Sequence, residues 1–179
     1  MISNRSSFRI GDKVVYPNHG VAVVEQISSR TVGQNVEQFY LLNIKASNMK
    51  VMVPFHNATS IGLRRVVKTG DVQKIVDFLA DGANDNNTDW KDRFKVNSDK
   101  MRTGGLMEVA IVLKCLLAVH QHKPLSFREK KMLERARYLL VSEVAIAKEC
   151  EELQVEQLLG DALAKSQLRL PDADELKTT

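Results

Sequence analysis

Hydrophobic and polar positions alternate over short stretches in the first third of the chain. This alternation predicts strands in KVVYP (13–17), GVAVVEQI (20–27), QFYLLNI (38–44) and KVMVP (50–54). Gly, Pro and Asn separate the stretches, most clearly in the turn Pro17–Gly20. Short β-rich segments broken by turn residues every eight to twelve residues or so are typical of a small antiparallel barrel or sandwich. We therefore expect a β module that ends near residue 67.

From Gly70 onward the apolar residues recur at helical spacing. The helical segments are 70–82, a helix opening after Thr88, 106–119, 125–147 and 151–164. Asp71 and Thr88 are predicted as N-caps, and Ser126 with Glu129 has the spacing of a capping box. Segment 106–119 is apolar almost all round, which predicts the central helix of a bundle. For the last helix we expect an apolar stripe of Leu153, Leu158, Leu159, Ala162 and Leu163.

These patterns predict an α+β protein of two domains, a small antiparallel β barrel followed by an all-α helical bundle. The expected boundaries are residues 1–67 for the β domain and 68–166 for the helical domain. Residues 167–179, which include the polar sequence LPDADELKTT, are expected to form a disordered tail.

Charge is distributed unevenly along the chain, although its sum is only +4. Residues 1–68 hold nine basic and three acidic residues, and residues 123–137 hold six basic and two acidic ones. From Glu143 onward acidic residues outnumber basic ones by nine to four. This distribution indicates an anionic partner that is contacted by one face, although ordinary solvated helix faces would give the same numbers.

The sequence carries no signature of catalysis. It lacks the phosphate-binding loop G-x-x-x-x-G-K-[ST], the dinucleotide fingerprint G-x-G-x-x-G, and the motifs H-E-x-x-H and G-x-S-x-G. Cys115 and Cys150 have no CxxC spacing and are interpreted as reduced thiols of a cytoplasmic protein. We expect no enzyme activity, no catalytic residue, no metal, no cofactor, no small-molecule substrate and no membrane span.

Nucleic-acid binding fits the residues better. The helix after Thr88 begins with Trp90, the only tryptophan of the chain. Basic residues in its first turns and in the helix at 125–147 would contact phosphates; they are Lys91, Arg93, Lys95, Arg128, Lys131 and Arg135. An exposed Trp90 would act as an apolar wedge at a base step. The alternative is that Trp90 begins a core stripe, since Phe94, Asn97 and Met101 follow at helical spacing.

Nearly the whole chain resembles the CarD/CdnL family of bacterial transcription regulators. The resemblance rests on GDKVVYPNHG (11–20), WKDRFKVN (90–97) and LSFREKKMLERAR (125–137). It implies a Tudor-like amino-terminal domain that docks on the β subunit of bacterial RNA polymerase. It also implies a helical domain that contacts promoter DNA at the upstream edge of the transcription bubble. Transcription-repair coupling factors share the first domain but also carry helicase motors, whose motifs this chain lacks.

The resemblance also implies roles for single residues. Trp90 matches the family tryptophan held against the minor groove at the upstream fork, and Lys95 and Arg93 match basic residues of the same stretch. Arg30 matches a family arginine on the polymerase side. Two positions depart from the family pattern, because Met52 and Asp92 stand where relatives often carry a basic residue.

The function that follows from the resemblance is transcription regulation by stabilising the promoter open complex, without strong sequence specificity. The expected partners are RNA polymerase, through Arg30 and Met52, and promoter DNA. We expect a cytoplasmic monomer that reaches the nucleoid through the polymerase. Two alternatives stay open, a stand-alone nucleic-acid-binding protein of the nucleoid or RNA-processing type and a pure protein-interaction adaptor.

Overall fold

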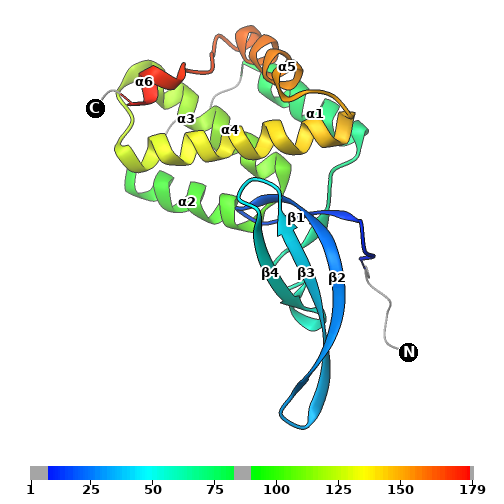
Figure 1. The fold of residues 1–179 in the computed structure, drawn as a ribbon. Coiled ribbons are helices and arrows are strands. Elements are labelled where there is room, and N and C mark those ends of the chain that lie inside the picture. The colour runs from blue at the N-terminus through cyan, green and yellow to red at the C-terminus, as the bar shows by residue number, and fades with distance from the viewer. Residues whose placement is uncertain (1–7, 83–89, 178–179) are drawn as a thin grey trace. The chain divides into compact units, whose positions relative to one another are not determined.

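The computed structural model describes residues 8–82 and 90–177, without the side chains of residues 90, 91, 173 and 177. The chain divides into two compact units, residues 1–66 and 67–179. In the described residues, the first unit is a five-stranded antiparallel sheet and the second is built of helices (Figure 1). The predicted α+β fold class, with a Tudor-like β domain before a helical domain, is therefore confirmed.

The strands of the first unit follow the predicted stretches closely. They are β1 (Lys13–Tyr16), β2 (Gly20–Val32), β3 (Asn35–Ile44), β4 (Met49–Pro54) and the short β5 (Arg64–Arg65), with a 3₁₀ turn η1 (Phe55–Asn57) after β4. Their order across the sheet is β4-β3-β2-β1-β5. The predicted turn between β1 and β2 is confirmed, because the N–H of His19 donates to the carbonyl of Tyr16 at 3.0 Å. Gly20 closes this turn at φ 94°, a conformation that glycine adopts without steric strain.

One face of the sheet carries the core of the β unit. Along β3 the buried residues alternate with half-buried ones, so that Tyr40, Leu42 and Ile44 all point inward. The Tyr40 ring stacks on Phe55 at 3.9 Å between ring centroids, and its hydroxyl accepts the N–H of Phe8 at 3.2 Å. These contacts tie the segment before β1 and the segment after β4 to the same core.

Strands β2 and β3 form a longer hairpin than the hydrophobic pattern predicts. Their pairing continues to Val32 and Asn35, which flank a two-residue turn. Gly33 lies at φ 65° in this turn, and a positive φ at the first turn position is what a type II′ hairpin requires. The hairpin extends as an arm beyond the shorter strands (Figure 1). The pattern missed the arm because it has no core to pack against, and its strands therefore carry polar residues on both faces.

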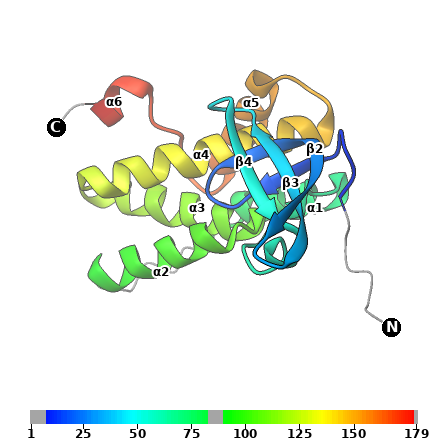
Figure 2. The same ribbon diagram turned by 60° about the horizontal axis from the view of Figure 1, so that its bottom comes forward.

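The second unit contains helices α1 (Thr69–Ala80), α2 (Trp90–Thr103), α3 (Leu106–His122), α4 (Phe127–Lys148), α5 (Glu152–Lys165) and α6 (Ala173–Lys177) within the described residues. The apolar helix α3 contacts α1, α2 and α4, which confirms the prediction of a central helix. Helices α2, α3 and α4 lie side by side (Figure 2). Helix α5 packs mainly on α1 and α4.

Three local predictions for the helices need correction or stay untested. Asp71 is not an N-cap, because α1 begins two residues earlier and Lys68 occupies the cap position. Leu153 is 68% exposed, and Val155 takes the buried position that begins the stripe of α5. The buried stripe therefore begins two residues later than predicted. The predicted N-cap Thr88 lies outside the described residues.

The predicted disordered tail is wrong for the described part of residues 167–177. Leu168 and Leu176 are buried and belong to the core of the helical unit. Arg169 binds the Glu175 carboxylate through two nitrogens, and Arg137 of α4 donates to the carbonyl of Pro171 at 3.0 Å. The local sequence is polar enough to resemble a tail, but Leu168, Leu176 and the hydrogen bond from Arg137 fasten it to the helices, and the Arg169–Glu175 pair closes the segment on itself.

Candidate functional site

Helix α2 begins at Trp90, but the side chains of Trp90 and Lys91 lie outside the described residues. The positions that follow at helical spacing face inward, since Asn97 and Met101 are buried and Phe94 is half-buried. This is the stripe that the core interpretation of Trp90 requires. The DNA interpretation and the core interpretation of Trp90 both stay predictions.

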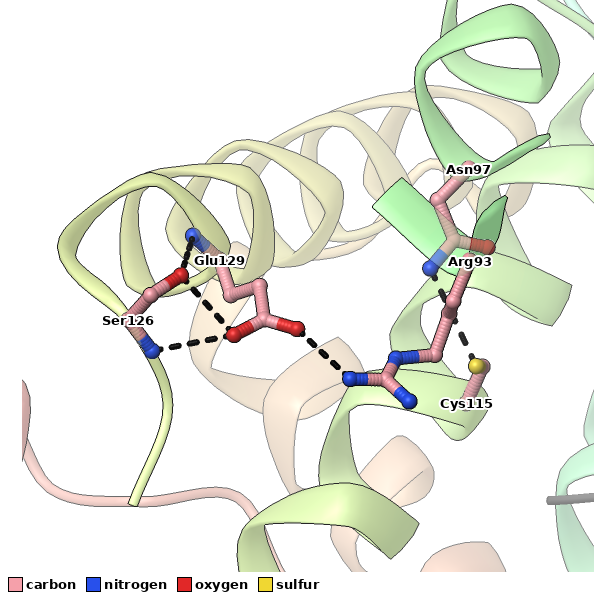
Figure 3. A network of polar contacts seen from close by, with 5 residues as sticks. All are labelled: Arg93, Asn97, Cys115, Ser126 and Glu129. Atoms are coloured by element: carbon pink, nitrogen blue, oxygen red, sulfur yellow. Dashed lines mark hydrogen bonds and ion pairs between the residues drawn. The ribbon is translucent and has the colours of Figure 1, made fainter. Parts of the chain in front are cut away.

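The structure contradicts the prediction that Arg93 offers its charge to DNA. The residue is only 6% exposed, and its Nη2 lies 3.0 Å from Oε1 of Glu129 on α4 (Figure 3). An arginine that is buried and paired in this way holds two helices together and is not available to a phosphate. The sequence could not predict this burial. Arg93 and Lys95 are both basic and only two residues apart, and the fold alone shows that the first is buried and the second exposed.

Glu129 is the centre of a small polar network at the beginning of α4. Its Oε2 accepts the N–H of Ser126 at 2.9 Å and the Ser126 hydroxyl at 2.8 Å, while the Ser126 Oγ accepts the N–H of Glu129 at 3.3 Å. The predicted capping box is therefore confirmed. Burial by itself would raise the pKa of the Glu129 carboxyl, but the hydrogen bonds from Ser126 and the Arg93 guanidinium hold the pKa below its usual range.

The predicted DNA-binding cations other than Arg93 and Lys91 lie at the surface, fully or in part. Lys95 of α2 and Arg128 and Lys131 of α4 are exposed, whereas Arg135 is half-buried. Lys131 forms an ion pair with Glu134 at 3.0 Å on the same helix. The Arg93–Glu129 pair holds the first turns of α2 and α4 together, and Lys95 and Arg128 are exposed residues of the same turns. Exposed cations of this kind are suited to bind an anion such as a phosphate.

Sequence reasoning did not single out Phe127, the first residue of α4. Its side chain is 73% exposed, and the Lys131 ammonium lies 5.8 Å from the centre of its ring. Its position directly after the N-cap Ser126 could have indicated exposure, because the first turn of a helix often lies at the end of a bundle.

The two residues predicted to bind the polymerase lie on one face of the sheet. Arg30 of β2 pairs with Glu37 of β3, and Met52 of β4 pairs with Leu41 of β3. Residues 37 and 41 are four apart on β3 and therefore point to the same side. Since directly paired residues also share a face, strand register places Arg30 and Met52 on the same side of the sheet, opposite the core.

This face mixes charged and apolar side chains. Arg30 is exposed, and Met52 is half-buried, as are Phe39 and Leu41 on β3. Further along the face, Glu25 forms an ion pair with Lys50 at 3.0 Å and accepts from Asn43 at 2.7 Å. The hydrogen bond from Lys50, followed by that from Asn43, lowers the pKa of Glu25. A charged and partly apolar face of this kind is suited to a protein partner.

The search for metal sites and membrane spans covers the described residues alone. Among them, no cluster of three or more His, Cys, Asp or Glu side chains could hold a metal ion. Within the same ranges, 8–82 and 90–177, no helix combines the length and the apolar character needed to cross a membrane. Cys115 and Cys150 are both unpaired thiols.

Known proteins match both units. Residues 8–67 match the family described as "CarD-like/TRCF RID domain", and residues 74–160 match the family "CarD, C-terminal domain". A protein from Bacillus subtilis (strain 168), named "Putative transcription factor YdeB", is 35% identical over 148 residues. The matched region covers 83% of this chain and 97% of that protein. The carboxyl-terminal segment with Leu168 and α6 lies beyond the matched family domain.

Proposed function

The chain belongs to the CarD family of transcription factors, and from this premise we propose that it stabilises the promoter open complex. In this proposal the β unit binds the β subunit of bacterial RNA polymerase. The helical unit contacts promoter DNA at the upstream edge of the bubble, without strong sequence specificity. The observation that carries the proposal is the exposure of three cations, Lys95, Arg128 and Lys131, in the first turns of α2 and α4.

The polymerase contact is assigned to the sheet face that carries Arg30 and Met52. Met52 replaces a basic residue found in many relatives, so this contact depends on apolar burial as well as on charge. The neighbouring half-buried Phe39 and Leu41 support that interpretation, because they extend the apolar part of the same face.

The first contribution to DNA binding is electrostatic. A few exposed cations bind DNA weakly and with little sequence preference, because they neutralise only a few phosphates. Attachment to the polymerase through the β unit supplies the missing affinity, since a tethered module meets its second partner at a high effective concentration. The protein then acts where the polymerase places it, and it does not need to find a DNA sequence.

Trp90 provides the preference for melted DNA in this proposal. Stacking of an aromatic ring on a base is worth roughly 1–3 kcal/mol, whereas insertion into intact duplex first costs a few kcal/mol of unstacking. The indole therefore adds little to duplex binding but stabilises DNA that the polymerase has already opened. A difference of about 1.4 kcal/mol changes the equilibrium tenfold, which is enough to matter at promoters with unstable open complexes.

The test replaces Trp90 with Ala and measures the lifetime of the open complex after competitor is added. We expect the lifetime to fall about tenfold, with polymerase affinity and the unfolding temperature of the variant unchanged. Val96→Ala is the matched control, because Val96 is a half-exposed apolar residue of the same helix. An unchanged lifetime in a folded Trp90→Ala variant contradicts the proposal, and a melting temperature lowered by several degrees supports the core interpretation of Trp90.

Two other functions predict different behaviour in simple binding experiments. A stand-alone nucleic-acid-binding protein would bind DNA or RNA tightly without polymerase. An adaptor would bind polymerase and leave the open-complex lifetime unchanged, even in the wild type. The exposed cations favour the first of these two over the second.

A further inference from the structure

Phe127 is a large apolar side chain that lies almost fully in solvent on a well-capped helix. It is 73% exposed, and the residue before it, Ser126, forms the capping box with Glu129. The backbone at this position is therefore fixed, and the ring is held outward by an ordered helix start. A single exposed apolar residue is common on protein surfaces, so its surroundings decide what it means.

One cation lies close to the Phe127 ring, and two more belong to the same turns of α4. Arg128 follows it directly, and Lys131 lies one turn further with its ammonium 5.8 Å from the ring centre. Arg135, another turn along, extends the row, because positions four residues apart lie on the same side of a helix. We call Phe127, Arg128, Lys131 and Arg135 the basic-aromatic surface. Its row from 127 to 135 measures about 12 Å along the helix axis.

Acidic residues lie within this surface and beyond its end. Glu134 lies within it but is already paired with Lys131 at 3.0 Å. Beyond Arg135, a cavity beside Tyr138 is lined by three carboxylates, Glu134, Glu152 and Glu156, and by Arg137, which forms an ion pair with Glu156 at 2.9 Å. A polyanion would be attracted to the first two turns of α4 and repelled by the carboxylates of this cavity. A bound polyanion would therefore lie over the start of α4 and not over the cavity.

The geometry points to an unpaired nucleic-acid strand as the occupant of the basic-aromatic surface. Phe127 stacks on an exposed base, while Arg128, Lys131 and Arg135 contact phosphates on either side. A phenyl ring has no hydrogen-bonding group with which to read base edges, so the contact has little sequence preference. In intact duplex the faces of the bases are covered by their neighbours, and insertion requires unstacking. The surface therefore prefers a melted strand to a duplex.

This inference rests on the proposed function, which places the protein at the edge of a bubble, but it assigns a second DNA contact that is separate from Trp90. It also gives a role to the exposed ring of α4 that the cations alone do not explain. Phosphate contacts by themselves would bind duplex and single strand with similar weakness.

The experiment uses the full-length protein and a fluorescein-labelled oligonucleotide of mixed sequence, single-stranded or annealed to its complement, at low salt. Fluorescence anisotropy gives the two affinities. We expect Phe127→Ala to weaken binding of the single strand about tenfold and binding of the duplex by less than about twofold. Phe127→Tyr, which keeps an aromatic ring, should restore the single-strand affinity. Leu153→Ala is the matched control, because Leu153 is a 68% exposed apolar residue of α5, and it should change neither affinity.

Three results would overturn the inference. They are an unchanged single-strand affinity in Phe127→Ala, an equal loss on both probes, and a wild type that binds neither probe. If Lys131→Ala and Arg135→Ala weaken binding while Phe127→Ala does not, the surface binds phosphates or an acidic protein segment by charge alone, and stacking is excluded.

The open-complex measurement separates this inference from the proposed function. If Trp90→Ala shortens the open-complex lifetime and Phe127→Ala leaves both oligonucleotide affinities unchanged, only the inference fails. If wild-type protein leaves the lifetime unchanged while Phe127→Ala weakens the single strand selectively, the proposed function fails and the basic-aromatic surface stands.

Discussion

The sheet face of the β unit and the helix starts of the helical unit hold their candidate residues in different ways. On the sheet, strand register alone puts Arg30 and Met52 on one side, while the core lies on the other. At the helix starts, a buried pair, Arg93 with Glu129, lies in the same helix turns as the exposed Lys95, Arg128 and Lys131. Changing a candidate residue on the sheet should therefore leave the stability of the β unit unchanged. Changing a residue at the helix starts can alter the stability of the helical unit.

This difference determines how mutations in the two regions should be interpreted. A substitution on the sheet face removes a contact and leaves the core in place, so a loss of binding can be attributed to the contact. A substitution at the helix starts can lower stability and binding together. Arg93 shows the problem most clearly, because a loss of DNA binding in a variant at this position would be a folding defect.

The largest effect is expected when Glu129 is replaced with Ala. The change removes the carboxylate that faces the buried Arg93 guanidinium and also half of the capping box. Loss of one member of a buried ion pair typically costs about 3–5 kcal/mol in the free energy of unfolding. Urea unfolding followed by circular dichroism measures it.

Glu134→Ala provides the comparison on the same helix. Glu134 pairs with the exposed Lys131, and a surface ion pair is worth about 0–1 kcal/mol. Equal losses in the two variants would show that the Arg93–Glu129 pair does not stabilise the helical unit.

On the sheet face, Arg30→Glu should weaken polymerase binding by at least about tenfold, equivalent to about 1.4 kcal/mol. Reversal of the charge places a carboxylate where the partner meets a guanidinium, and Arg30 is exposed, so the unfolding temperature should stay unchanged. Lys45→Glu, a charge reversal in the exposed turn after β3, is the control and should bind normally. Binding to immobilised polymerase measures both, and retained affinity in Arg30→Glu would reject this contact.

Acid should weaken the helical unit through Glu129. The pKa of this carboxyl is lower in the folded protein than its ordinary value of 4.5, so the folded state favours the charged form. Its contribution to stability is complete above about pH 4.5 and is lost as the pH falls through the folded-state pKa. Urea unfolding between neutral and acidic pH measures the slope. In Glu129→Gln this part of the slope should disappear, and an unchanged slope would show that other carboxyls cause the acid sensitivity.

The smallest effect is expected for Lys95→Ala. Loss of one exposed phosphate contact should weaken DNA binding by about threefold and reduce the slope of log affinity against log salt by about 1. Lys165→Ala, an exposed cation at the end of α5, is the matched control. If both variants lose DNA affinity equally, the affinity depends on the net charge of the protein, and the cations at the helix starts form no specific binding site.

Much of the architecture was predictable because it depends on local patterns. Alternation predicted β1 to β4, and the Ser126–Glu129 spacing predicted a capping box that the structure contains. Residues 28–37 of the arm were missed because polar residues occupy both faces and the two valines, Val32 and Val36, are exposed and follow no alternating pattern. The tail was misjudged because Leu168 and Leu176 find their partners in distant helices.

The candidate site was predicted less completely. Lys95, Arg128 and Lys131 are exposed as expected, but Arg93 is buried and Phe127 was overlooked. Arg93 and Lys95 belong to the same charged stretch and differ by about 200° around the helix axis. Spacing alone cannot say which side of a polar helix faces inward when no strong apolar stripe marks it.

By itself the sequence determined the elements of secondary structure, their division into a β unit and a helical unit, and the motifs that mark the family. These follow from the conformational preferences and periodicity of neighbouring residues. Only the tertiary structure decided which charges are buried. Arg93 meets Glu129, and Lys114 of α3 donates to the carbonyl of Phe78 at the end of α1, because a charge enters a protein interior only where a distant part of the chain supplies its partner.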